Sequence, residues 1–173
     1  KTFPDDPDIL CGLALAFASS DRLNMVANLE AALKINPAHV PALLRLADHL
    51  IDAEKYDEAR GLLDRVEKVN PHRPELAAYR AILAHLKNDP AAESEFRAAA
   101  LKFWPTNPLP DHLIGRKLSQ KYRFAEGAAR QRQALTFDSG YLPAQAQLAS
   151  DLLRLGEEEE GWQLAATVQA NNA

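Results

Sequence analysis

Three prolines recur at a constant interval of 34 residues, at positions 37, 71 and 105. The same register reaches Ser139, and the residues just before Pro37, Pro71 and Ser139 follow one pattern, in which an apolar residue precedes Asn or Asp. Five units of this length occupy 170 of the 173 residues. A fixed period of about 20–50 residues indicates one supersecondary unit repeated along the chain, with each copy burying its apolar face against the next. The expected units are residues 6–39, 40–73, 74–107, 108–141 and 142–173.

Each unit contains two stretches with helical periodicity. Apolar residues recur at spacings of three and four, as at Leu43, Leu46 and Leu50, and no stretch alternates with the two-residue period of a strand. The prolines fall at expected helix starts or between units, where they interrupt no helix. Pro90 lies inside a unit, but it follows Asp89 and therefore suits the first turn of a helix. We expect ten helices, at residues 7–18, 22–35, 41–53, 56–69, 74–87, 90–103, 109–121, 124–137, 142–154 and 158–170.

The period and the distribution of small residues resemble the tetratricopeptide repeat family over essentially the whole chain. In that family, small residues occupy the eighth and twentieth positions of each repeat, where the two helices cross closely. The eighth positions are Leu13, Ala47, Ala81, Gly115 and Ala149, and the twentieth are Met25, Ala59, Glu93, Gly127 and Gly161. The resemblance implies an all-α solenoid, a right-handed superhelix of about five antiparallel helix pairs that forms a single array over residues 1–173. Glu93 departs from the pattern, which favours a third repeat that slips by one residue.

The same resemblance implies a concave groove lined by the first helix of each repeat. In the second to fourth repeats the groove positions are Leu44, Asp48, Ile51, Ala78, Ile82, His85, His112, Arg116 and Ser119. The first and fifth repeats add Leu10, Ala14, Phe17, Ala146, Ser150 and Leu153. A peptide with apolar anchors and a carboxylate would fit this pattern, although packing against the next repeat accounts equally well for Leu44, Ile51 and Ile82. The Lys and Asn set of chaperone-binding members is not reproduced at the corresponding positions.

The net charge of -4 hides a basic segment in the middle of the chain. Residues 97–132 hold eight Lys and Arg but only Asp111 and Glu126 as acids. The basic patch consists of Arg116, Lys117, Lys121, Arg123, Arg130 and Arg132. Two interpretations are open: a surface balanced by acidic neighbours, or a landing site for an acidic partner. Nucleic acid is not expected, because the overall charge is negative and the nearby Tyr122 and Phe124 are assigned to repeat-core positions.

The residue pattern suggests neither catalysis nor a bound metal. The five histidines include no pair at four-residue spacing, as a helical metal site would need. His39 and His72 lie in equivalent turns and are expected to be exposed. The single cysteine, Cys11, lies among leucines and is expected to be a small buried hydrophobe. The acidic run at residues 157–160 opens a helix, where it suits the positive end of the helix dipole. We therefore expect no cofactor, no metal and no enzymatic activity.

No apolar run reaches the roughly 20 residues that a membrane span needs. Because the chain starts at Lys1 rather than Met, we expect it to be a piece of a longer protein, and its compartment stays open. The last expected helix, at residues 158–170, carries Trp162 and Val168 on an apolar face, and no polar capping helix follows it. We expect this face to meet a further repeat or to mediate self-association with a second copy of the chain.

Residues 103–108 and 112–124 also resemble a stretch of large bacterial repeat proteins, some of which carry a metallopeptidase domain elsewhere. The zinc motif of that peptidase is absent from this sequence, so nothing catalytic is carried over. Two functional hypotheses follow from the resemblances. The first is a non-catalytic bacterial scaffold that binds a protein or peptide partner, for instance an acidic one, in its concave groove. The alternative is a substrate-presenting or structural arm of a larger enzyme whose catalytic domain lies outside these residues.

Overall fold

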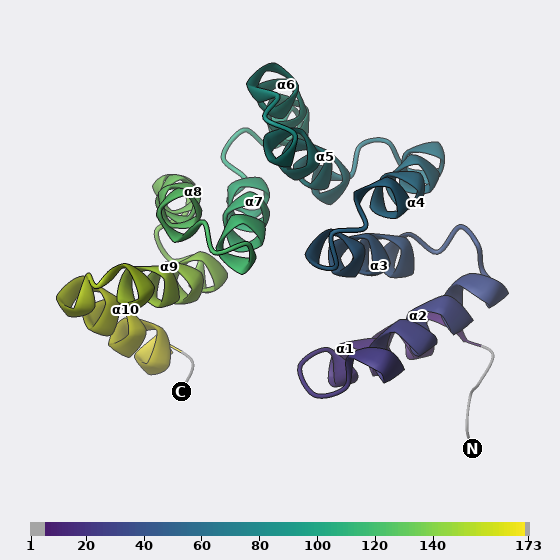
Figure 1. Ribbon diagram of the computed structural model, residues 1–173, viewed down its shortest axis with the longest axis horizontal. Coiled ribbons are helices and arrows are strands. Elements are labelled where there is room, and N and C mark those ends of the chain that lie inside the picture. Colours follow the sequence, from purple (N-terminus) through teal and green to yellow (C-terminus); the bar gives the residue numbers. More distant parts are fainter. Residues whose placement is uncertain (1–5, 172–173) are drawn as a thin grey trace. The chain divides into compact units, whose positions relative to one another are not determined.

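The computed structural model describes residues 6–171, which form ten α-helices and no strand. The chain divides into two compact units between His72 and Arg73, within one residue of the expected border between the second and third repeats. The first unit contains α1 (Pro7–Phe17), α2 (Arg22–Ile35), α3 (Val40–Asp52) and α4 (Tyr56–Val69). The second contains α5 (Pro74–Leu86), α6 (Pro90–Leu101), α7 (Leu109–Gln120), α8 (Phe124–Phe137), α9 (Leu142–Leu155) and α10 (Glu158–Asn171). The predicted all-α architecture is confirmed, and each unit is a series of helical hairpins (Figure 1).

Polar side chains and prolines start the helices where the sequence predicts. Asp89 caps α6 by accepting a hydrogen bond from the backbone N–H of Ala92 at 3.0 Å, and Pro90 occupies the first turn. His39 caps α3 through its Nδ1 atom, 3.3 Å from the backbone nitrogen of Ala42. Its Nε2 atom lies 3.0 Å from Oδ1 of Asp8, and His39 is buried. The expectation of an exposed turn histidine at this position is therefore wrong.

The turns inside four of the five hairpins, from α3–α4 to α9–α10, share one backbone conformation. Glu54, Asn88, Tyr122 and Gly156 have positive φ angles of 62°, 59°, 62° and 83°. These four residues are spaced at 34-residue intervals, so the left-handed conformation recurs with the sequence period. Glycine adopts this conformation without steric cost, whereas a bulky side chain such as that of Tyr122 is strained in it. In these four hairpins the left-handed turn therefore occurs with Glu, Asn, Tyr or Gly at the position.

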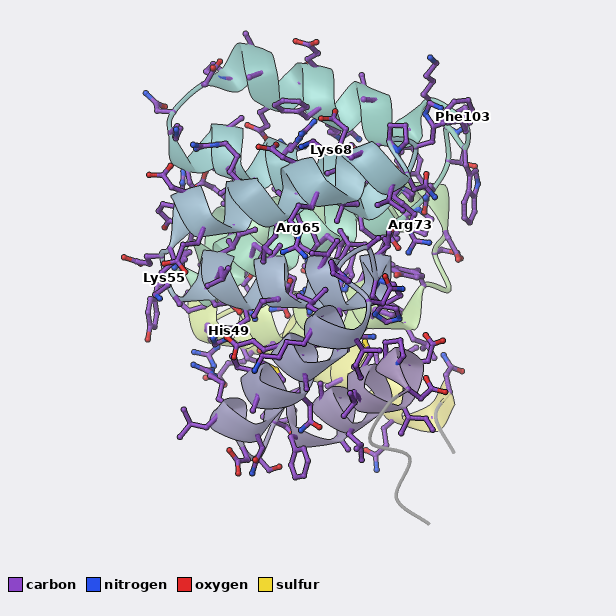
Figure 2. The ribbon with its side chains drawn as sticks, turned by 90° about the vertical axis from the view of Figure 1, so that its right-hand side faces the viewer. His49, Lys55, Arg65, Lys68, Arg73 and Phe103 are labelled. Carbon is purple, nitrogen blue, oxygen red and sulfur yellow. The ribbon has the colours of Figure 1, made fainter. Side chains whose placement is uncertain are left out.

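In the first unit, α1 packs on α2, α3 packs on α4, and α2 also contacts α3. The large side chains without exposed surface are Leu29, Leu43, Ile51, Leu63 and Val66. Ala47 and Ala59, the small residues of the second repeat, are also fully buried. Arg65, labelled in Figure 2, donates a hydrogen bond from Nη2 to the carbonyl oxygen of Pro37 at 2.7 Å. This bond ties α4 to the turn that precedes α3.

In the second unit, the hairpins α5–α6, α7–α8 and α9–α10 stack through contacts of α5 with α7 and of α8 with α9. Helices α7 and α8 cross closely. A Cβ atom added to Gly115 would lie 2.8 Å from the carbonyl oxygen of Gly127, and one added to Gly127 would lie 3.0 Å from that of Gly115. Only glycine fits both positions without a backbone shift. The family expectation of small residues at these positions agrees with the observed packing.

Candidate functional site

The nine predicted groove positions lie on first helices of the hairpins: Leu44, Asp48 and Ile51 on α3, Ala78, Ile82 and His85 on α5, and His112, Arg116 and Ser119 on α7. The buried apolar members are Leu44, Ile51, Ala78 and Ile82. A partner that binds without moving the helices has no access to these four side chains. Three polar members, His85, His112 and Ser119, take part in hydrogen-bond networks of the second unit.

Asp111 lies at the centre of an ion-pair network in the second unit, and its side chain has no exposed surface. It accepts hydrogen bonds from Nε of Arg97 at 2.7 Å and from Nη2 of Arg97 at 2.6 Å. Nη1 of Arg130 adds a longer contact at 3.4 Å. The hydrogen bonding to Asp111 raises the pKa of Arg97. Arg97, Asp111 and Arg130 lie on α6, α7 and α8, so the network links these three helices. Removal of one partner would leave an uncompensated buried charge.

Glu93 extends the network to α5. Its carboxylate pairs with Arg130 and lies 2.8 Å from Nδ1 of His85, whose Nε2 atom is 3.1 Å from Glu126. Glu93 is buried at the twentieth position of its repeat, and Ala100 is buried in the same register. The expected one-residue slip of the third repeat is therefore wrong. The repeat keeps its register because charged partners compensate the buried carboxylate.

The basic patch predicted from the sequence is largely paired. Its members are Arg116, Lys117, Lys121, Arg123, Arg130 and Arg132. Arg123 donates to Glu126 from Nε at 2.5 Å and lowers the pKa of that carboxyl group. Arg132 contacts Glu160 at 3.1 Å. Lys117 is buried. These contacts favour the interpretation of a surface balanced by acidic neighbours.

His112 has a structural environment. It is buried, its Nδ1 atom lies 2.9 Å from Oε1 of Gln131, and Gln131 donates back to the His112 carbonyl oxygen at 3.2 Å. The ring meets that of Tyr141 edge to face, with 5.6 Å between the centroids. Burial lowers the pKa of His112, which keeps the imidazole neutral around pH 7. The residue therefore joins α7 to α8 and to the turn before α9.

A polar hollow of about 330 Å³ lies beside Ser119 in the second unit. Ser119, Gln120, Tyr122, Phe124, Gln147, Ser150, Asp151 and Arg154 line it. At its base, the Ser119 hydroxyl donates to Oδ2 of Asp151 at 2.7 Å, and Nε2 of Gln147 donates to Oδ1 of Asp151 at 2.9 Å. Burial raises the pKa of the Asp151 carboxyl group, and the two hydrogen bonds oppose this shift. The buried carboxyl group thus fastens α9 to α7.

The rim of the hollow carries an exposed aromatic ring and a cation. Tyr122 is 81% exposed, and its ring meets that of Phe124 edge to face with 6.0 Å between the centroids. The guanidinium carbon of Arg154 lies 5.1 Å from the centroid of Phe124. The assignment of Tyr122 to the repeat core is therefore wrong. Its left-handed backbone conformation places it in the hairpin turn.

Sequence reasoning identified part of this hollow and missed the rest. Ser119 and Ser150 were among the groove positions that the family resemblance implies, and both line the hollow. Asp151 and Arg154 were not singled out. Their four-residue and seven-residue spacing from Gln147 on α9 places all three on one helix face, and this pattern could have pointed to them.

The described part of the chain contains no group of three or more His, Cys, Asp or Glu residues arranged to hold a metal ion. Among the helices between residues 6 and 171, none combines the length and the apolar character needed to cross a membrane. The hollow consists of hydrogen-bonding groups, one cation and aromatic rings. Such groups suit recognition of another molecule.

Comparison with known proteins agrees with the repeat fold. Residues 26–86 match the family model for the tetratricopeptide repeat. No curated protein sequence matches the chain. Among solved structures, PilW, a type IV pilus biogenesis factor, is 21% identical with a TM-score of 0.60 over 95% of this chain and 76% of its own. YrrB, a repeat protein described as having an unusual peptide-binding site, is 13% identical with a TM-score of 0.55 over 96% of this chain and 86% of its own.

A tetratricopeptide repeat protein from Parabacteroides merdae has a TM-score of 0.70 at 15% identity, over 97% of this chain and 66% of its own. At these identities the likeness concerns the fold alone. Stacked helical hairpins, the 34-residue period and the matched family model have one explanation in common. Residues 26–86 of this chain match the tetratricopeptide repeat model, and the whole described chain has the fold of such repeat proteins.

Proposed function

We propose that the chain is a non-catalytic interaction module that binds an extended peptide segment of a partner protein in the hollow of the second unit. The observation that carries this proposal is the set of hydrogen-bonding side chains gathered there from α7, α9 and the turn before α8. Helical repeats generally bind partners through surfaces formed by neighbouring repeats. The description of YrrB as a repeat protein with a peptide-binding site supports the same class of function.

The chemistry of the hollow favours a peptide backbone with a carboxylate. The side chains of Gln120, Gln147 and Ser150 offer hydrogen-bonding groups that can meet backbone N–H and C=O groups. Arg154 supplies a cation that can donate to a carboxylate through its guanidinium group. The exposed ring of Tyr122 offers an apolar surface with a hydroxyl group for an adjacent side chain. We therefore propose an acidic residue or a C-terminal carboxylate in the bound segment.

The base of the hollow is held before any partner binds. Asp151 accepts hydrogen bonds from Ser119 on α7 and Gln147 on α9, so the two helices are fixed relative to each other. Fewer side chains need to be ordered on binding, and this preorganisation favours affinity. The predicted apolar anchors on α3 and α5 are not part of the proposed site, because their side chains are buried.

Selection from a phage-displayed library of random peptides tests the proposal. The enriched peptides are then titrated against the chain by fluorescence anisotropy. Ser150→Arg fills the hollow and Arg154→Glu reverses its charge, so each should weaken binding at least tenfold. The matched controls are Ala129→Arg, at an exposed position of α8, and Arg22→Glu, at the exposed start of α2. Both controls should leave the affinity unchanged. Peptides that bind Ser150→Arg as tightly as the original chain would refute the assigned site.

A further inference from the structure

The first described helix exposes an apolar surface that its repeat equivalents bury. Four periods of 34 residues relate α1 to α9, so Ile9 corresponds to Gln145 and Leu15 to Asp151. Gln145 and Asp151 are buried, whereas Ile9 is 41% exposed and Leu15 is 48% exposed. The only charged residue of α1 is Asp8. A helix that is apolar on nearly all sides is normally covered on all sides.

The last described helix, α10, also exposes an apolar side chain, on the face that its repeat equivalent α8 uses to pack on the next hairpin. One period relates α10 to α8, so Trp162 corresponds to Ala128. Ala128 is 1% exposed, because it packs in a cluster with Leu148 and Leu152 of α9. Trp162 is 64% exposed. A large aromatic side chain therefore stands where the internal repeat joint has a small buried one.

The two exposed faces complement each other in size. At the internal joint, the small Ala128 of α8 packs against the large Leu148 and Leu152 of α9. Four periods earlier, α1 has Gly12 and Ala16 at the positions of these two leucines. A Cβ atom added to Gly12 would meet nothing within 4 Å. The large Trp162 would therefore face small residues and open space, which inverts the sizes at the internal joint.

The two faces also complement each other in polarity. At the internal joint, the Ser119 hydroxyl donates to buried Asp151. The repeat equivalent of Ser119 on α9 is Leu153, and that of Asp151 on α1 is Leu15. Leu153 keeps the register, because it lies against Gly161 as Ser119 lies against Gly127. A hydrogen-bonded pair inside the array thus becomes a pair of leucines at the two ends.

We propose that α10 of one copy of this chain docks on α1 of a second copy, in the register that joins α8 to α9. Trp162 of one copy packs over Gly12 and Ala16 of the other, and Leu153 meets Leu15. This joint continues the established stacking of hairpins, and the inverted sizes and polarity favour the chain's own α1 as the occupant. Because the two faces differ, the contact is heterologous and generates head-to-tail assemblies, as rings or open filaments, rather than symmetric dimers.

The arrangement can be tested by sedimentation velocity of the 173-residue chain over a range of concentrations. The chain should form species beyond the dimer as concentration rises. Leu15→Glu blocks the α1 face and Trp162→Glu blocks the α10 face, so each variant alone should be monomeric at concentrations where the original chain assembles. An equimolar mixture should form dimers and nothing larger, because it restores one intact α1 face and one intact α10 face.

Two controls separate assembly from misfolding. Leu23→Glu and Phe103→Glu place a charge at exposed apolar positions outside the proposed joint, and both should assemble like the original chain. Figure 2 shows Phe103 at the periphery of the ribbon. Circular dichroism should show the original helix content in all four variants.

The outcomes are distinct. A symmetric contact between two α10 helices would make Trp162→Glu monomeric, leave Leu15→Glu dimeric, and give no new dimer on mixing. If a flanking segment of a longer protein or an unrelated partner covers these faces, the isolated original chain will be monomeric at every concentration. Either result overturns the proposal.

Discussion

The substitution Gly127→Ala tests the close crossing of α7 and α8. The added Cβ atom would lie 2.1 Å from Oγ of Ser119, 3.0 Å from the carbonyl oxygen of Gly115 and 3.1 Å from Oδ2 of Asp151. Ser119 must rotate, which breaks its hydrogen bond to the buried Asp151. The backbone of α7 must also give way, because the Gly115 carbonyl oxygen cannot rotate aside.

The expected loss of stability follows from three contributions. Overpacking costs about 1–3 kcal/mol, and loss of a hydrogen bond to a charged buried group costs about 1.5–3 kcal/mol. Alanine is better than glycine in a helix by about 1 kcal/mol, which offsets part of this cost. The free energy of unfolding should therefore fall by about 1.5–5 kcal/mol.

Urea unfolding measures this change. The two tryptophans, Trp104 and Trp162, both belong to the second unit, so their fluorescence reports on the unfolding of that unit. Far-ultraviolet circular dichroism follows the loss of helix in both units. With a denaturant dependence of about 2 kcal/mol per molar urea, the midpoint of unfolding should fall by about 0.8–2.5 M. Gly161→Ala is the matched control one repeat later. There the nearest atoms belong to the flexible side chain of Leu153, at 2.9 Å, so the cost should be smaller.

The double variant Ser119→Ala with Gly127→Ala refines the result. Removal of Oγ relieves the 2.1 Å contact, so the two changes should cost less together than the sum of their separate effects. If Gly127→Ala lowers the free energy of unfolding no more than Gly161→Ala does, the close crossing of α7 and α8 does not determine stability.

Three further predictions concern other features of the fold. Gly156→Ala should lower the free energy of unfolding by about 1 kcal/mol, because φ is 83° at this position. Gly61→Ala, inside α4 with no neighbour within 4 Å, should raise it by about 1 kcal/mol. If urea unfolding shows both variants changed in the same direction, the assigned turn at Gly156 is wrong. Burial raises the pKa of the Asp151 carboxyl group in the folded state, so its contribution to the free energy of unfolding should grow as pH falls from above that pKa toward 3.8. Over this window, the free energy of unfolding of the original chain should rise relative to that of Asp151→Asn. A difference between the two that does not depend on pH would contradict this prediction. Arg97→Met should lower the free energy of unfolding by about 3 kcal/mol, because the buried Asp111 loses its main charged partner. The further substitution Asp111→Leu should recover part of this loss. If the effects of the two substitutions simply add, the pair is not coupled.

The helices and the stacking were predictable because they depend on local periodicity. Apolar spacing determines which face of a helix is buried, and the 34-residue period determines how many times the hairpin recurs. Gly115 and Gly127 could be assigned to a close crossing from the repeat register, and the contact geometry agrees with that assignment.

The charged network was not predictable from the same pattern. Glu93 and Arg130 are 37 residues apart on different hairpins, and their pairing depends on how those hairpins stack. A run of basic residues in the sequence does not reveal which acids from other helices approach it. Tyr122 was misassigned for a related reason: an aromatic residue near the start of a helix is compatible with the repeat core, but the positive φ angle that places Tyr122 in the turn, where its side chain is exposed, is not visible in the sequence.

The recurrent left-handed turn affects how divergent repeats are detected. The chain reverses direction four times with the same backbone angle at Glu54, Asn88, Tyr122 and Gly156, yet the four side chains have no chemical property in common. A search that scores glycine at this site would recognise only one of the four reversals. Structure-based alignments of related arrays gain sensitivity if they score the left-handed backbone conformation at this site and ignore residue identity.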